Sequence, residues 1–202
     1  MTQWFEKYHY WTKRIWLYLC RCRYVHGFGI QSPTAYHFLR YVINEPYAYY
    51  AYSDLKERFP HESRLRYKLC ELYFRLSNFA QASQWAVCLP HQNLYEAYIQ
   101  AGCHHSKVVN DIYGKDEGQE SISDVLLITS DNSGKTLFET FANQAGSLSI
   151  IIVEAIHASK DTKQLWYRML ADPRTVVTFD LYYCGIIFFD HRKTKQHYIV
   201  HF

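Results

Sequence analysis

A glutamate and a histidine stand three positions apart directly after an apolar run in the second half of the chain. The run covers residues 148–153, and Glu154 and His157 follow it. If the run is a buried strand, both side chains lie at its carboxyl end, where open α/β sheets bind ligands. His157 would then act as a base or a substrate contact beside Glu154. The alternative is a loop into a helix, with His157 hydrogen-bonded to backbone and Glu154 facing solvent.

The segment 130–136 reads Ser-Asp-Asn-Ser-Gly-Lys-Thr and stands between an apolar run and a helical pattern. A phosphate-binding loop needs a further glycine five residues before the glycine of Gly-Lys-Thr. Thr129 occupies that position. The pattern therefore favours a polar turn with a helix N-cap over a phosphate site.

Cysteines and histidines cluster twice, as Cys20, Cys22 and His26 and as Cys103, His104 and His105. Neither cluster has the paired two-residue spacing of a structural zinc site, so we expect no metal. The six cysteines lie mostly in helical or strand patterns, which indicates reduced thiols and a cytoplasmic protein. The first residues also lack the basic and apolar regions of a signal peptide.

Size and charge limit the function classes further. The 202 residues fit one domain with an appendage, and the net charge of +3 is too small to indicate nucleic-acid binding. The longest early apolar run, residues 15–20, is too short to cross a membrane. The 19 tyrosines and 12 phenylalanines must fill a core or an interface.

Residues 1–78 read as a helical segment. Aromatic and apolar residues share one face of a predicted helix over 3–24, which ends at the glycines of 26–29. Ser32 and Pro33 begin a second helix that runs to about Asn44. Further helices are expected over 53–58 and 62–76. Basic residues beside the aromatic face would suit a bilayer surface, but packing within the domain or in a homodimer is favoured.

Residues 79–202 alternate short apolar runs with helical segments, which is typical of a parallel sheet. Strands are expected at 84–89, 107–109, 125–129 and 148–153, and helices from Leu94 to Ala101, over 135–144 and over 160–170. Three closing runs, 175–181, 185–189 and 197–202, indicate antiparallel edge strands, and 111–123 reads as an exposed loop. The fold class is α/β: a reduced Rossmann-like sheet with antiparallel C-terminal edge strands and an N-terminal helical segment.

Two segments carry distinctive motifs. The first is His-Gly-Phe-Gly-Ile-Gln-Ser-Pro at 26–33, followed by an aromatic helix and the pair Tyr49 and Tyr50. The second runs from Ile-His-Ala-Ser-Lys at 156–160, through Asp-Pro-Arg at 172–174, to the three closing strands. Both segments resemble a family of bacterial class I S-adenosylmethionine-dependent methyltransferases found mainly in Bacteroidetes. The resemblance implies a methyltransferase scaffold with S-adenosylmethionine as its cofactor.

The family's cofactor motifs are changed in this chain. The family places an acid and a glycine-rich turn after its first strand, whereas residues 89–93 contain neither. Asn110 or Asp111 stands where the family's ribose-binding acid lies. Residues 129–132 replace an Asp-Gly-Asn-His motif, and Glu154 with Ala155 replaces two aspartates.

We therefore expect a diverged methyltransferase-like protein without competent cofactor binding, which acts as a binding or structural module. The alternative is an active methyltransferase of an unknown small-molecule substrate, with a rebuilt site. In that case Asn93, Asp111 and Asp131 would contact the cofactor, and Glu154 and His157 would be catalytic.

Overall fold

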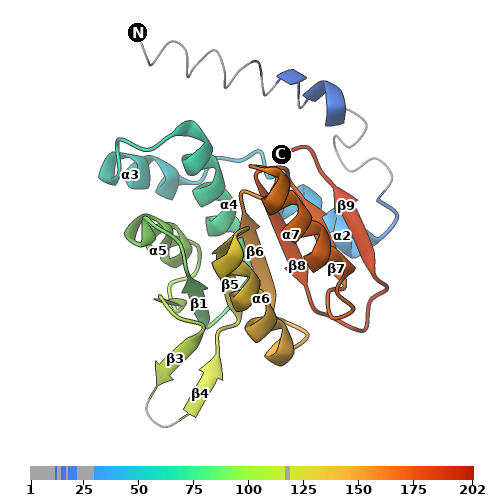
Figure 1. Cartoon of the computed structure of the whole chain (residues 1–202). Coiled ribbons are helices and arrows are strands. Elements are labelled where there is room, and N and C mark those ends of the chain that lie inside the picture. Colours follow the sequence, from blue (N-terminus) through green and yellow to red (C-terminus); the bar gives the residue numbers. More distant parts are fainter. Residues whose placement is uncertain (1–11, 13–14, 17, 22–29, 117–118) are drawn as a thin grey trace.

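The computed structural model describes residues 12, 15, 16, 18–21, 30–116 and 119–202. Within these ranges a mixed sheet lies between two layers of helices, and a two-stranded ribbon projects from it (Figure 1). The helix predicted over 3–24 and its stop at 26–29 fall mostly outside these ranges. Its described residues between 12 and 21 are helical.

Helices fill the described chain before the first strand. Helix α2 (Pro33–Phe38) begins where the Ser32 side chain accepts the backbone N–H of Ala35 at 3.4 Å, and it continues as the π-helix η2 (Leu39–Ile43) up to Asn44. The start and end predicted for this helix are therefore confirmed. Helix α3 (Tyr50–Arg58) begins earlier than expected, and α4 (Arg64–Ala80) ends later.

The seven-stranded sheet has the order β2-β1-β5-β6-β8-β7-β9. Its strands are β1 (Gln84–Val87), β2 (Lys107–Val109), β5 (Val125–Thr129), β6 (Ile150–Glu154), β7 (Val177–Asp180), β8 (Cys184–Phe188) and β9 (Gln196–Ile199). The first four are mutually parallel, and β8 runs antiparallel to both β6 and β7. The α/β class is thus confirmed, with a mainly parallel mixed sheet.

The last strand corrects one expectation. The antiparallel pairing predicted for the closing strands is confirmed between β7 and β8 but is wrong for β9, which pairs with β7 in parallel. The reason is the position of β8, which lies between β6 and β7 and leaves the far edge of β7 as the place where β9 pairs. A strand that returns from β8 to that edge runs in the direction of β7.

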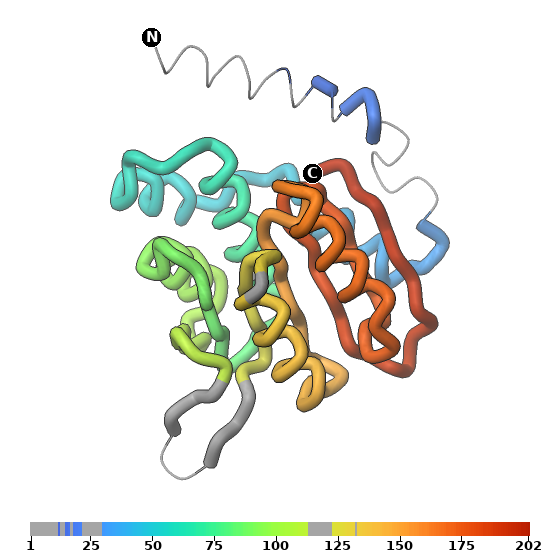
Figure 2. Tube along the Cα trace, viewed as in Figure 1, coloured from blue at the N-terminus to red at the C-terminus, as the bar shows by residue number. Residues whose placement is uncertain are grey.

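Helices cover both faces of the sheet. Helix α5 (Gln92–Gly102) packs with α2, α3 and α4 on one face, whereas α6 (Asn132–Gln144) and α7 (Lys160–Ala171) lie side by side on the other (Figure 2). Successive strand residues alternate between the layers: Leu126 faces α6 and α7, and Leu127 faces α4 and α5. Both faces of β5 are buried, which explains its uninterrupted apolar sequence.

The connection from β2 to β5 is a hairpin of β3 (Tyr113–Asp116) and β4 (Gln119–Ile122). The expectation of an exposed loop over 111–123 is therefore wrong. The backbone N–H of Ser123 donates to the carbonyl of Ile112 at 3.0 Å and closes the base of the hairpin. The segment is polar and lacks the apolar alternation by which strands are recognised.

One glycine determines how α7 meets the sheet. A Cβ atom at Gly185 of β8 would lie 2.3 Å from the ring of Trp166 on α7. The indole of Trp166 is fully buried, so close packing of helix on strand requires glycine at this position. The described cysteines are all free thiols. Among the helices that the structure describes, none has the length and apolar character needed to cross a bilayer.

Candidate functional site

Three strand ends meet at one edge of the sheet. Strand β6 ends at Glu154 and β7 ends at Asp180, while the antiparallel β8 begins between them at Cys184. Glu154 is paired in register with Cys184, and Asp180 is paired with Gly185. Two carboxylates therefore lie at the same edge, separated only by the start of β8.

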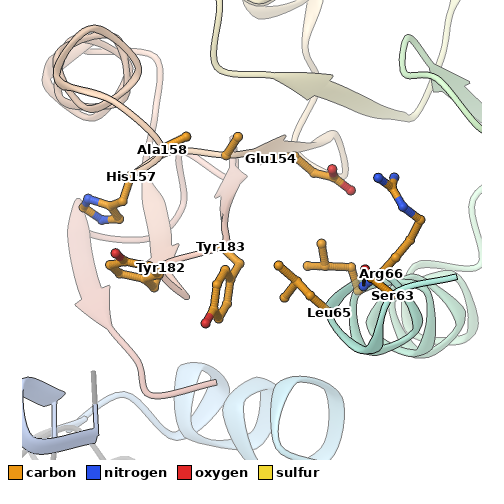
Figure 3. Close-up of a pocket in the computed structure, with 10 residues that line it drawn as sticks. Ser63, Leu65, Arg66, Glu154, His157, Ala158, Tyr182 and Tyr183 are labelled. Atoms are coloured by element: carbon orange, nitrogen blue, oxygen red, sulfur yellow. Dashed lines mark hydrogen bonds between the residues drawn. The ribbon is translucent and has the colours of Figure 1, made fainter. Parts of the chain in front are cut away.

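Left-handed backbone turns shape this edge. Ala155 and Tyr182 have φ angles of 61° and 73°, a conformation that residues other than glycine rarely adopt. The N–H of Ala155 donates to the carbonyl of Tyr183 at 2.8 Å and ties the two turns together. The turns direct the chain from Glu154 to His157 and bring the tyrosine pair beside them (Figure 3).

Asp180 is the centre of a buried cluster. Its Oδ2 lies 2.7 Å from Nε2 of His157, and its Oδ1 accepts from Nη2 of Arg21 at 2.8 Å. Arg21 also donates to the carbonyls of Asp180 and Val200, each at 3.0 Å. The ring of Tyr182 stacks on His157 with centroids 5.1 Å apart. These contacts hold the imidazole in one orientation.

The surroundings of Asp180 stabilise its charged form. Burial by itself raises the pKa of this carboxyl, but the hydrogen bond from His157 and the charge of Arg21 outweigh it and lower the pKa to about 2. Asp180 is thus ionised at neutral pH and accepts hydrogen bonds only. The side chain of Asp180 is only 5% exposed, and its Oδ1 also accepts the N–H of Tyr182 in the following turn at 2.8 Å. Asp190 lies in another turn and accepts from Arg192.

Glu154 has a second set of partners, from the helices of the opposite layer. The hydroxyl groups of Tyr73 on α4 and Tyr95 on α5 donate to its Oε1 at 2.6 and 3.2 Å. Arg66 of α4 donates to the hydroxyl of Tyr95 at 2.6 Å, so the guanidinium and the carboxylate are joined through a phenol. Burial raises the pKa of Glu154 despite these hydrogen bonds and the charge of Arg66.

A cavity of about 260 Å³ lies between these two groups of residues. His157 and Tyr182 line one side, the first turn of α4 lines the other, and Glu154 and Arg66 stand at the same end (Figure 3). Leu65, Leu69 and Tyr183 supply apolar surface. Both residues proposed as catalytic from the sequence therefore line one cavity. Neither of the alternative placements holds, since His157 bonds to a side chain and Glu154 is bonded to tyrosines.

The residues proposed to contact a cofactor lie elsewhere. Asn93 is exposed in the first turn of α5. Asp111 is exposed after β2, and its Oδ1 accepts the N–H of Ile112 at 2.7 Å. Asp131 is the N-cap of α6, where it accepts the N–H of Gly134 at 2.8 Å. The polar turn and N-cap expected in this segment are confirmed.

The turn between β1 and α5 has a left-handed residue where no glycine is available. His91, the N-cap of α5, has a φ of 65°. The carbonyl of His91 accepts the N–H groups of Leu94 and Tyr95 and starts the helix. The Sγ of Cys88, at the end of β1, lies 3.6 Å from the carbonyl of Asn110 after β2. The ends of β1 and β2 are thus adjacent.

The sequence gives no local signal for several residues of this edge. Arg21, Arg66, Tyr73 and Tyr95 lie on helices whose spacing indicates core or surface packing only. Among the described residues, no group of three or more histidine, cysteine, aspartate or glutamate side chains lies close enough together to hold a metal ion. Comparison of the chain with models of known protein families and with curated protein sequences found no match.

Proposed function

We propose that this chain is a methyltransferase-like protein of Rossmann-like topology that does not hold S-adenosylmethionine and works as a binding module. The topology supports the scaffold. From β1 the chain passes through α5 to β2 on one side, and later strands continue from β5 on the other. The switch point between β1 and β5 is where open α/β sheets bind nucleotides. Helices α5 and α6 lie on opposite faces, as in doubly wound sheets.

The observation that carries the loss of cofactor is the conformation of His91. A cofactor at this turn needs the backbone to approach closely, and glycine permits this because it has no Cβ. Here the left-handed position is filled by histidine. The residues present therefore do not fit the methionine end of S-adenosylmethionine at the β1 turn.

The carboxylates near the switch point support the same conclusion. Asp131 is occupied as a helix cap, and one oxygen of Glu154 is bonded to two tyrosines that fill the space between α4, α5 and the sheet. Tyr73 and Tyr95 are fully buried. S-adenosylmethionine placed between these two helices and the sheet would have to break this packed cluster.

Titration with S-adenosylmethionine and with S-adenosylhomocysteine tests the proposal. Isothermal calorimetry on the full chain should show no saturable heat with either compound at millimolar concentration, and thermal unfolding should not shift. Micromolar binding of either compound would overturn it.

The second candidate is an active methyltransferase with a rebuilt site. Asp111 favours it, because this exposed carboxylate follows β2 directly beside the end of β1 and has the position expected of a ribose ligand. In this case S-adenosylmethionine binds, and Asp111→Asn lowers the affinity for it at least about tenfold, which is the loss expected for one charge-assisted hydrogen bond. Glu57→Gln, an exposed site on α3, is the control that should change nothing.

A binding module needs a partner or a ligand. The homodimer proposed through aromatic helices is compatible with four exposed tyrosines on and around α2, η2 and α3, namely Tyr36, Tyr41, Tyr47 and Tyr50. Light scattering after gel filtration distinguishes monomer from dimer. If the chain is a dimer, Tyr50→Ser combined with Tyr47→Ser should dissociate it.

A further inference from the structure

The cavity beside Glu154 contains one carboxylate and one guanidinium that do not contact each other directly. Glu154 and Arg66 both line it, yet among the described residues they form no ion pair and are joined only through the hydroxyl of Tyr95. In Figure 3 the carboxylate and the guanidinium point toward one another across the end of the cavity. A charged pair that is held apart in a cavity is suited to a ligand with two charges of its own.

The unused atoms define what such a ligand must carry. Both tyrosine hydroxyls that bind Glu154 donate to Oε1, so Oε2 has no donor among the residues that the structure describes. A carboxylate oxygen that is left without a protein donor at the wall of a cavity favours a cationic group such as an ammonium. Arg66 uses Nη1 for Tyr95 and Nε for Glu62, at 3.2 Å, which leaves its Nη2 for an anionic group.

The start of α4 adds to the anionic end. Ser63 caps this 17-residue helix by accepting the N–H of Arg66 at 3.2 Å, and Ser63, Leu65 and Arg66 all line the cavity. The N-terminus of a helix carries partial positive charge from its aligned peptide groups. A carboxylate placed here meets both this charge and the guanidinium, next to the ammonium position at Glu154.

We propose that this cavity binds a small zwitterion whose ammonium and carboxylate groups are attached to the same carbon atom, as in a free α-amino acid. The ammonium is held by Oε2 of Glu154, the carboxylate by Arg66 and the first turn of α4, and the side chain packs on Leu69 and Tyr183. The volume of about 260 Å³ is sufficient for a ligand of this size. This inference names the ligand class of the binding module proposed above and rests on that proposal.

Three matched compounds test the ligand class on the full chain. Leucine has both charged groups, isocaproic acid has its carboxylate without the amine, and isoamylamine has its amine without the carboxylate. Serine and phenylalanine sample smaller and larger side chains. Ligand-observed NMR and calorimetry should show binding of at least one amino acid, with an affinity at least tenfold above that of either leucine analogue if leucine binds. Binding of none of the amino acids, or equal binding of isocaproic acid and leucine, overturns the proposal.

Variants assign the binding to this cavity. Glu154→Gln keeps an acceptor for both tyrosines but removes the negative charge. The affinity for the amino acid should therefore fall at least tenfold, and the affinity for isocaproic acid should not change. Arg66→Gln should abolish the preference for leucine over isoamylamine, which lacks the carboxylate. Glu57→Gln is the matched control on an exposed site. Amino-acid binding that Glu154→Gln leaves unchanged contradicts this site.

The same experiment separates this inference from the proposed function. S-adenosylmethionine also carries an α-amino acid group, so its binding alone would be ambiguous. If S-adenosylmethionine binds at the β1 turn, Asp111→Asn weakens its binding while amino-acid binding persists. This result would refute the proposed loss of cofactor binding and would leave the amino-acid site in the cavity supported. If Glu154→Gln alone weakens it, the cavity is the site.

Discussion

Nε2 of His157 lies 2.7 Å from Oδ2 of Asp180, and the geometry determines which nitrogen of the ring is basic. Asp180 is ionised at neutral pH, so the shared proton belongs to Nε2. The lone pair of the imidazole then lies on Nδ1. This is the arrangement in which a carboxylate orients a histidine for proton transfer. Arg21 compensates the charge of Asp180 from its other side.

Removing the charge of Asp180 should destabilise the fold strongly. Asp180→Asn leaves the guanidinium of Arg21 buried without a carboxylate, and the loss of one partner of a buried pair costs about 3 kcal/mol of unfolding free energy. Urea denaturation at pH 7 measures it. Asp190→Asn is the matched control, because Asp190 pairs with an Arg192 side chain that is 77% exposed, and it should change little. Equal effects of the two variants would contradict the buried cluster.

The stability of the wild-type chain should fall in acid for the same reason. The pKa of Asp180 is lowered to about 2 in the folded protein, against about 3.9 in an unfolded chain. Its contribution is complete above about pH 5 and is lost as the pH falls through the folded pKa, by about 2–3 kcal/mol in total. The unfolding free energy of wild type and Asp180→Asn should therefore converge between pH 4 and 2. Parallel curves would show that Asp180 does not carry the effect.

Glu154 should have the opposite dependence on pH. Its pKa is raised in the folded protein, mainly by burial. The folded state therefore disfavours ionisation, and stability is lost as the pH rises through the folded pKa. Glu154→Gln removes the charge and keeps the acceptor at Oε1. By urea denaturation, the free energy of unfolding of the variant should exceed that of wild type by about 1 kcal/mol at pH 8 and should equal it at pH 4. A Glu154→Gln variant that is less stable than wild type at pH 8 would refute this prediction.

Glycine at the β1 turn should relieve the strain of the left-handed backbone. The left-handed φ of His91 costs about 1 kcal/mol for a residue with a Cβ. His91→Gly should recover about half of that, because glycine also has more freedom in the unfolded chain. Ala155→Gly, at a φ of 61°, should raise the stability by a similar amount. Gln92→Gly, inside α5, should lower the stability of the protein. Thermal unfolding ranks the three.

The packing of α7 on β8 can be tested at Gly185. Gly185→Ala places a Cβ 2.3 Å from the buried ring of Trp166, which must then shift in a filled core. Overpacking of this kind costs about 3 kcal/mol of unfolding free energy, measurable in urea. Gly146→Ala is the control, since a Cβ there meets no atom within 4 Å. Combining Gly185→Ala with Trp166→Leu should recover part of the loss.

The sequence predicts the strands best where the two faces of the sheet are covered. Strand β5 begins and ends at the expected residues, because it is an apolar run with polar neighbours on both sides. Strand β9 is different. Its connector permits either direction, and only the position of β8 inside the sheet determines that it runs parallel to β7. The hairpin over 113–122 is polar and therefore reads as a loop.

The site is predictable only in part, for a related reason. Glu154 and His157 follow one strand, and their shared cavity follows from the rule for strand ends in open sheets. Their partners come from residues far away in the sequence, and no local pattern marks Tyr73 or Asp180 as such a partner. The same apolar spacing that predicts a helix places Tyr73 and Tyr95 in the core without indicating that their hydroxyls meet a carboxylate.

The contacts of Arg21 also set an order of events during synthesis. Its side chain binds Asp180, 159 positions later, and the carbonyl of Val200, 179 positions later. Arg21 leaves the ribosome long before either partner has been translated, and a loop of that length closes only when the strands that hold its far end have formed. A nascent chain that stops before β7 has no place for this guanidinium. Docking of Arg21 therefore requires that β7 and β9 have already formed, and a probe placed beside it would report when these two strands are in place.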